Sequence, residues 1–394
     1  MKIKIIDTID DPFLKFEWER LEREYEIFPQ STYHWCMTWW NYLGGNRRLH
    51  VVMAMDDEGK TVAIAPLCIE RNFGVYVLRS FPIHFGDFYT FITSNNESSQ
   101  AGINSILEYM ASKRQWRWVQ LQHVSEKSSL LKKLVDYNCV KKEMTDCIIA
   151  DFRGLDWESY LSRLRKSFRA DLLRRLRIMH KAYKAELVCV RTWREYEHKF
   201  DEMVTIHQER WKDDYSPKKT ATELACWKAV IKGQFEAGKM VYYQLFFDSV
   251  CVAYDLGFLH GGTYYDWHTS YRPDYRKYNP GIMMQALMIK HFIDNGISRI
   301  NFMAGEYYYK MHWSPDQRVE KTFMLTSASN NISGLLMNCY HHVLRDRLKV
   351  FYHKAMQYGV LRFLSRHVIR LRKRISHIER TVGVVCANVF GKTL

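Results

Sequence analysis

The stretch that decides the fold is TYYDWHTSYRPDYRKYNPG (263–281), followed by IMMQALMIKHFIDN (282–295) and SRINFMAGEYYYKMHW (298–313). Polar and aromatic residues alternate from Thr263 to Ser270, and this pattern predicts a strand. A polar loop then leads to Pro280-Gly281, and apolar residues recur at helical spacing from about Ile282 to Asn295. The sequence therefore predicts a strand whose loop ends directly on a helix N-terminus.

Such a helix end suits an anionic ligand. The first backbone N–H groups of a helix have no partner within the helix, and the helix dipole places partial positive charge on them. Pro280 fits the first helical position, because its missing N–H costs nothing there, and Gly281 lets a ligand approach the backbone. We therefore expect an anion site at this loop.

Length and composition indicate a folded protein of more than one domain. The chain has 394 residues, 47% of them hydrophobic and 15% aromatic, which is ample for packed cores. The first half shows helices, a hairpin and mixed strands, and the second half repeats that order after a long arginine-rich helix over 157–184. We expect an α/β fold (an α+β mixed sheet) of two tandem domains, 1–152 and 153–328, with a basic helical C-terminal extension over 329–394.

The positive charge is concentrated in two segments. The formal net charge is +15, and the excess lies in residues 163–184 and 345–380. The first segment is either a solvated helix face or a surface for phosphate or nucleic acid. The second either packs on the body of the protein or makes peripheral contact with an anionic membrane.

Common catalytic and targeting motifs are missing from the sequence. The acidic N-terminus lacks the apolar core of a signal peptide, and no apolar run is long enough to span a membrane. We therefore expect a cytoplasmic protein, with the inner face of the membrane as a possible peripheral location. The 9 cysteines are scattered singly and the 16 histidines show no metal-ligand spacing, so we expect reduced thiols and no metal.

One family resemblance rests on the stretch quoted above. It runs through Tyr271, Tyr275, Tyr278-Asn279-Pro280-Gly281, Gly305-Glu306, Tyr309-Lys310 and Trp313. This order resembles the GNAT acyltransferase superfamily, specifically the acetyltransferase-like cellulose-biosynthesis proteins of the CelD/BcsL type, which are related to FemAB double-domain aminoacyltransferases. The chain departs from that pattern at Asn279, where serine is common, and at Arg272 and Asn301, where aspartate is common.

The resemblance implies an acyl-CoA site between two strands that splay apart, Thr263–Ser270 and Arg299–Met303. The first domain would be a degenerate copy, because its corresponding segment lacks the Pro-Gly loop. The implied cofactor-binding residues are Tyr271, Tyr275, Arg276, Lys277, Tyr278, Asn279, Pro280, Gly281, Ile282 and Met283. The implied substrate-binding residues are Gly305, Lys310 and Trp313.

Acyl transfer needs a base for the attacking amine or hydroxyl and an acid for the departing thiolate. Glu306 is the first candidate base, followed by Asp266 and His268, which share one face of a strand. Tyr309 or Tyr278 could protonate the thiolate. Each also has a structural alternative: Glu306 could pair with Lys310, His268 could be a core histidine, and Trp313 with the tyrosine run could serve packing alone.

The resulting expectation is an acyl-CoA-dependent N- or O-acyltransferase, in the first instance an acetyltransferase. By the resemblance, it would act on a sugar, amino sugar or other polysaccharide or cell-envelope precursor. One alternative is a FemAB-like aminoacyltransferase that uses aminoacyl-tRNA, although we do not expect nucleic acid as a partner. The other is a non-catalytic module that binds membrane or nucleic acid through its basic helices.

Overall fold

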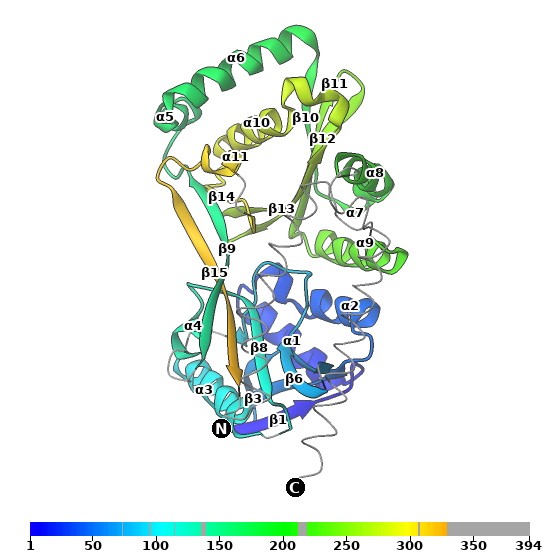
Figure 1. Ribbon diagram of the computed structural model, residues 1–394, viewed down its shortest axis with the longest axis vertical. Coiled ribbons are helices and arrows are strands. Elements are labelled where there is room, and N and C mark those ends of the chain that lie inside the picture. Colours follow the sequence, from blue (N-terminus) through cyan, green and yellow to red (C-terminus); the bar gives the residue numbers. More distant parts are fainter. Residues whose placement is uncertain are drawn as a thin grey trace, which may run out of the picture.

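The computed structural model describes residues 1–72, 74–93, 96–113, 115–134, 139–211, 219–305 and 308–328. Figure 1 shows two lobes, one above the other, with the long strands β9 and β15 running between them. The predicted C-terminal extension (329–394) lies outside the described residues. The division into domains at 152 and 328 stays a prediction.

The first half of the chain carries short helices around two groups of strands. Its elements are β1 (Lys2–Ile6), α1 (Pro12–Glu24), η1 (Pro29–Ser31), α2 (Tyr33–Leu43), β2 (Arg48–Leu49), β3 (Val51–Met55), β4 (Thr61–Ala65), β5 (Leu67–Asn72), β6 (Val75–Ser80), β7 (Ile92–Thr93), α3 (Glu97–Ser112), β8 (Trp118–Ser125), α4 (Ser129–Leu134) and β9 (Val140–Asp151).

The second half begins with two helices and contains the stretch from which the sequence analysis started. Its elements are α5 (Trp157–Arg163), α6 (Lys166–Ala182), β10 (Ala185–Val190), α7 (Trp193–Tyr196), η2 (Glu197–Lys199), α8 (Phe200–Arg210), α9 (Ala221–Glu236), β11 (Met240–Phe247), β12 (Val250–His260), β13 (Thr263–Tyr271), η3 (Pro273–Tyr278), α10 (Pro280–Asp294), β14 (Arg299–Asn301), α11 (Tyr308–Met311) and β15 (Arg318–Ala328).

One mixed sheet runs through both halves. Its strand order is β10-β11-β12-β13-β14-β9-β15-β8-β6-β5-β2, and a second sheet has the order β1-β3-β4-β7. The two parallel pairs in the large sheet are β13 with β14 and β6 with β8. Strand β15 pairs antiparallel with β8 on one side and with β9 on the other. The last strand of the second half is therefore hydrogen-bonded into the first half.

Packing also joins the halves. One hydrophobic cluster combines Trp18 and Trp35 of the first half with Tyr196 and Phe258 of the second. The cluster beneath α3 includes Phe323, which β15 contributes. Between helices α2 and α9, the Gln234 side chain donates to the Thr32 hydroxyl at 3.2 Å. The two halves thus share buried hydrophobic clusters.

Sequence reasoning was wrong about three elements. The single helix expected over 157–184 is two helices, because Leu164 turns extended (φ −69°, ψ 151°) and buries its side chain between them. The sequence REYEHKFDEMVTIHQERW (194–211) predicts one helix, but the structure divides this stretch into α7, η2 and α8. The apolar run CIIADF (147–152) predicts a strand that begins at Cys147, but β9 begins seven residues earlier, at Val140.

The fold predicts one specific packing constraint. A Cβ at Gly257 would lie 2.2 Å from the Tyr265 carbonyl oxygen and 2.5 Å from Tyr264 Cζ, whereas a Cβ at Gly281 would meet only Tyr271 Cδ1, at 3.6 Å. We expect Gly257→Ala to lower the free energy of unfolding by about 1–3 kcal/mol or more. Gly281→Ala is the matched control and should leave it unchanged, as measured by urea denaturation. Equal stability of the two variants would contradict this packing.

Candidate active site

The site opens where two parallel strands separate. Strands β13 and β14 pair from Thr263↔Arg299 to Tyr265↔Asn301, and no pairing continues beyond that point in the described chain. Asn301 stabilises the separation of the strands, because its Oδ1 accepts a hydrogen bond from the Met303 N–H at 2.9 Å. Met303 itself adopts a left-handed φ of 53°. The chain thus turns away from β13 directly after the last pair.

Helix α10 begins beside this opening. Asn279 is left-handed (φ 53°, ψ 56°), Pro280 follows at the first helical position, and the Asn279 side chain makes no capping hydrogen bond. The Met283 N–H bonds back to the Asn279 carbonyl at 3.2 Å. The amides of Gly281 and Ile282 are therefore the candidate donors to an anion.

A cavity of about 800 Å³ lies where the two strands part. The end of β13, the start of α10, the segment after β14 and helix α11 form its base, and helices α6 and α8 contribute Phe168, Asp171, His207 and Arg210. The Arg210 guanidinium lies 4.8 Å from the Tyr271 ring centroid, and Tyr271 borders Gly281. One cation therefore stands near the helix N-terminus.

One buried carboxyl, Asp266, lines the cavity, and a second, Asp255, lies next to it outside the lining. Asp266 on β13 is 4% exposed and Asp255 on β12 is 1% exposed. The Tyr264 hydroxyl donates to Asp255 Oδ1 at 2.5 Å. Burial raises the pKa of Asp266 to about 6, against the opposing charge of Lys310. Burial and the neighbouring Asp266 charge raise the pKa of Asp255 further.

Lys310 supplies a positive charge next to these acids. Its Nζ donates to the carbonyls of Phe302 at 2.7 Å and Ala304 at 3.0 Å, which fixes the segment after β14. Burial lowers the pKa of Lys310, although Asp266 opposes that shift. Asp87, which belongs to the first half, also lines the cavity, and burial raises its pKa to about 6.

Two of the three histidines that line the cavity, His207 and His268, are held neutral. His268 Nδ1 lies 2.8 Å from the Tyr254 hydroxyl, and the rings of His268 and His207 are 4.5 Å apart. Burial lowers the pKa of His268 well below its usual value, with His207 contributing, and burial with the charge of Lys219 lowers that of His207 to about 4. An imidazole that resists protonation is a weaker base than Asp266.

The residues expected from sequence divide into three groups. Those that line the cavity are Asp266, His268, Tyr309, Tyr271, Asn279, Gly281, Ile282 and Lys310. Those outside its lining are Tyr275, Arg276, Lys277, Tyr278, Pro280, Met283, Gly305 and Trp313. Glu306, the first candidate base, lies outside the described residues. Its predicted role as the base therefore stays a prediction.

Several residues of the second group have structural partners. Tyr275 and Tyr278 pack around Tyr183, with ring centroids 6.3 Å and 5.2 Å from it. Trp313 is fully buried and donates its indole N–H to Gln285 Oε1 at 2.8 Å. Arg276 and Lys277 are exposed. These contacts match the packing alternative that the sequence left open for Trp313.

Sequence reasoning missed Asp87, Asp255, Arg210 and Gln285. Asp255 had a usable signal, because a single acid stands within the apolar strand VCVAYDLGFLH (250–260) and buried acids require partners. Asp87 and Arg210 had none, since they come from distant parts of the chain.

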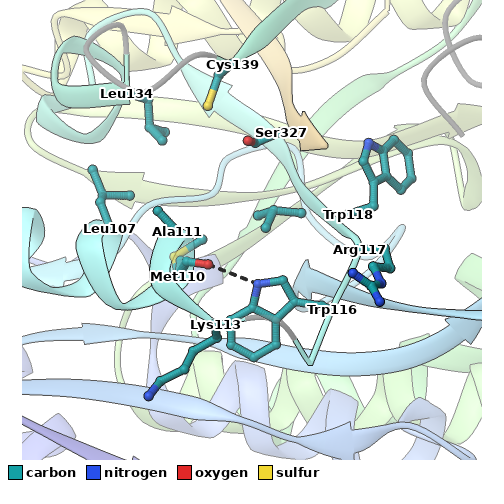
Figure 2. A pocket seen from close by; sticks show the side chains of 11 residues that line it. Leu107, Met110, Ala111, Lys113, Trp116, Arg117, Trp118, Leu134, Cys139 and Ser327 are labelled. Carbon is teal, nitrogen blue, oxygen red and sulfur yellow. Dashed lines mark hydrogen bonds between the residues drawn. The ribbon is translucent and has the colours of Figure 1, made fainter. Parts of the chain in front are cut away.

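A smaller cavity in the first half lacks this chemistry. It encloses about 160 Å³ between α3, α4 and β8, and Figure 2 shows its largely apolar side chains, with the Trp116 indole donating to the Met110 carbonyl at 3.0 Å. Burial raises the pKa of its Cys139 thiol to about 11. Its lining contains no carboxylate, so we assign it no catalytic role.

Two searches of the described residues gave no candidates. They contain no group of three or more His, Cys, Asp or Glu side chains placed to hold a metal ion. None of their helices is both long and apolar enough to cross a membrane.

Comparison with known proteins identifies the fold. Residues 166–311 match a family model described as an acetyltransferase (GNAT) domain. FemX is 11% identical, with a TM-score of 0.57 over 87% of this chain and 100% of that chain. The C-terminal domain of a putative lysylphosphatidylglycerol synthetase from Agrobacterium fabrum is 9% identical, with a TM-score of 0.53 over 84% and 96%. L-PGS from Bacillus licheniformis is 13% identical, with a TM-score of 0.50 over 86% and 98%.

These comparisons support a double GNAT fold whose second half carries the acetyltransferase domain, as expected from the resemblance. The fold class, a mixed α/β tandem GNAT-like architecture, is confirmed. The domain match supports an acyltransferase. No curated protein matches the chain.

The neutral histidines predict a pH dependence of stability. The unfolded chain binds a proton at His207 below about pH 6.5, whereas the folded chain does so only near pH 4. The contribution of neutral His207 to the free energy of unfolding is therefore fully present above about pH 6.5. It is lost as the pH falls toward 4, by at most about 1.4 kcal/mol per pH unit.

His207→Gln should lose less stability than the wild type between pH 7 and pH 4.5 in urea denaturation. The exposed His198 provides the matched control, and His198→Gln should follow the wild-type curve. Parallel curves for His207→Gln and the wild type would contradict a His207 side chain that stays neutral in the folded protein.

Proposed function

We propose that the protein is an acyl-CoA-dependent N- or O-acyltransferase whose co-substrate lies in the cavity between β13 and β14. The observation that carries the proposal is the cavity itself. It opens where the two strands part, directly in front of the uncapped start of α10. The acetyltransferase domain match over 166–311 supports the same class.

The residues around the opening suit a phosphorylated co-substrate. The amides of Gly281 and Ile282 and the guanidinium of Arg210 are donors to a pyrophosphate. The nearest atom to a Cβ at Gly281 is 3.6 Å away, so a ligand has room to approach the backbone there. A pantetheine arm would run along the parted strands toward Asp266.

Asp266 is the proposed base. It lines the cavity, and its pKa near 6 leaves it ionised at neutral pH yet basic enough to take a proton as the acceptor attacks. The acceptor nitrogen or oxygen bonds to the thioester carbon, its proton passes to Asp266, and the carbon–sulfur bond breaks. Tyr309 lines the same cavity and is the proposed proton donor to the thiolate. Lys310 fixes the segment between them through its carbonyl contacts.

The proposed acceptor is a carbohydrate or another cell-envelope precursor. The resemblance to the CelD/BcsL type favours a sugar, amino sugar or other polysaccharide or envelope precursor. The large cavity, with both aromatic and polar walls, is compatible with such an acceptor. The proposed membrane contact of the C-terminal segment falls on residues outside those described.

A second candidate is an aminoacyltransferase that uses aminoacyl-tRNA. The observation in its favour is that α6 contributes Phe168 and Asp171 to the cavity while it exposes Lys166, Arg177 and Lys181. One structurally similar protein is named a lysylphosphatidylglycerol synthetase. Salt-sensitive tRNA binding that Arg177→Glu weakens, without any response to CoA, would favour this candidate over the first.

Thermal denaturation with acetyl-CoA or CoA tests the first proposal. A ligand at 100 times its Kd stabilises the folded state by about 2.7 kcal/mol, so the melting temperature should rise. Gly281→Glu should abolish the rise, because the new side chain places a negative charge at the phosphate site. Gly281→Ala is the matched control and should keep it. No rise with any acyl-CoA, or an equal rise in all three proteins, would contradict the proposed site.

A further inference from the structure

The strand geometry brings two acids from neighbouring strands together. Strands β12 and β13 pair Gly257 with Asp266 and Leu256 with His268, so Trp267 is an extra residue at a bulge. Beyond the bulge, Asp255 pairs with Thr269. Gly257 lacks a side chain, and the Tyr264 ring occupies that space with its hydroxyl on Asp255. The two carboxyls meet beneath this ring.

The hydrogen bonds of the pair require one proton between the acids. Tyr264 donates to Oδ1 of Asp255. The Oδ2 atoms of Asp255 and Asp266 are both buried, and no donor reaches either of them from the described residues, while the two side chains contact each other. Two ionised carboxylates cannot share so enclosed a space, whereas a carboxylic acid can donate to a neighbouring carboxylate.

We propose that Asp255 is a positioning residue that keeps its proton and donates it to Asp266, so that Asp266 alone is ionised and held toward the cavity. The catalytic consequence rests on the proposed function, in which Asp266 is the base. Asp255 accepts from Tyr264 and donates to Asp266, and it touches no substrate itself. Neither Asp255 nor Tyr264 has the cavity exposure that a catalytic residue needs.

The surroundings explain why the proton stays on Asp255. Asp255 is enclosed by Tyr264, Thr269 and Asp266 of β13 and by Tyr243 of β11. Asp266 faces Lys310 of α11, and Lys310 in turn faces Asp87 of the first half and Cys147 of β9. Lys310 interacts more strongly with Asp266 than with Asp255, so its charge favours an ionised Asp266, while burial raises the pKa of Asp255 well above its usual value.

The arrangement defines the proton path of a turnover. The acceptor proton moves to Asp266, and the Asp255 O–H bond remains intact throughout. The pair then carries two protons and no charge, and one proton leaves from Asp266 to solvent or to Tyr309, which has protonated the thiolate. The hydrogen bond that Asp255 donates to Asp266 also keeps the Asp266 side chain from rotating away from the cavity.

Infrared difference spectroscopy of the carbonyl stretch of protonated carboxyl groups tests where the proton lies. At pH 8, where Asp87 and Asp266 are ionised, the wild type should show a buried protonated carboxyl. Asp255→Asn should lose that band, and Asp266→Asn should keep it. A band that persists in Asp255→Asn, or that disappears only in Asp266→Asn, would overturn the assignment.

Turnover provides the readout that a merely structural role would not move. The pH profile of the rate of acetyl-CoA consumption, measured with an amine or hydroxyl compound that serves as acceptor, should have an acidic limb. The pKa of Asp266 should set that limb. Asp255→Ala removes the donated hydrogen bond, so that limb should move to higher pH and kcat should fall about tenfold or more. Asp255→Asn can still donate, and it should keep the limb and stay within a few-fold of the wild-type kcat.

The two variants separate the possible failures. An unmoved limb in Asp255→Ala would overturn the positioning role. Absence of thioester turnover in every variant, together with the expected infrared result, would instead count against the proposed function and leave the proton assignment standing.

Discussion

The site depends on the end of hydrogen bonding between β13 and β14. Two parallel strands that part after three paired residues leave backbone groups and a space that side chains do not fill. The Asn301 side chain caps the turn at Met303, and Lys310 binds the carbonyls of Phe302 and Ala304. The start of α10, the cavity and the carboxyl pair all lie around this one opening.

The first half stabilises the opening from the opposite side. Strand β14 is only three residues long, yet it pairs with β9, and β9 pairs in turn with β15 along nearly its whole length. Asp87 reaches the cavity from the first half. A tandem fold therefore gives the short strand a rigid neighbour, and an isolated second half would lose both β9 and this acid.

The fold-deciding stretch was predictable from sequence because its signals are local. Alternation gave β13, and Pro280 with the apolar spacing gave α10, whose observed span begins at Pro280. Strand β15 was missed because Glu320, Thr322 and Thr326 are buried and hide any alternation. The contributions of Asp87 and Arg210 depend on long-range packing, which no local pattern records. Tyr275 and Tyr278, expected at the cofactor, pack on Tyr183 and do not line the cavity.

The most direct measurement is a structure of the protein with CoA bound. We expect a pantetheine arm between β13 and β14, a pyrophosphate on the amides of Gly281 and Ile282 beside Arg210, and the sulfur toward Asp266. CoA bound elsewhere on the protein, or a cavity that stays empty at a CoA concentration far above that of the protein, would contradict a CoA site at this opening.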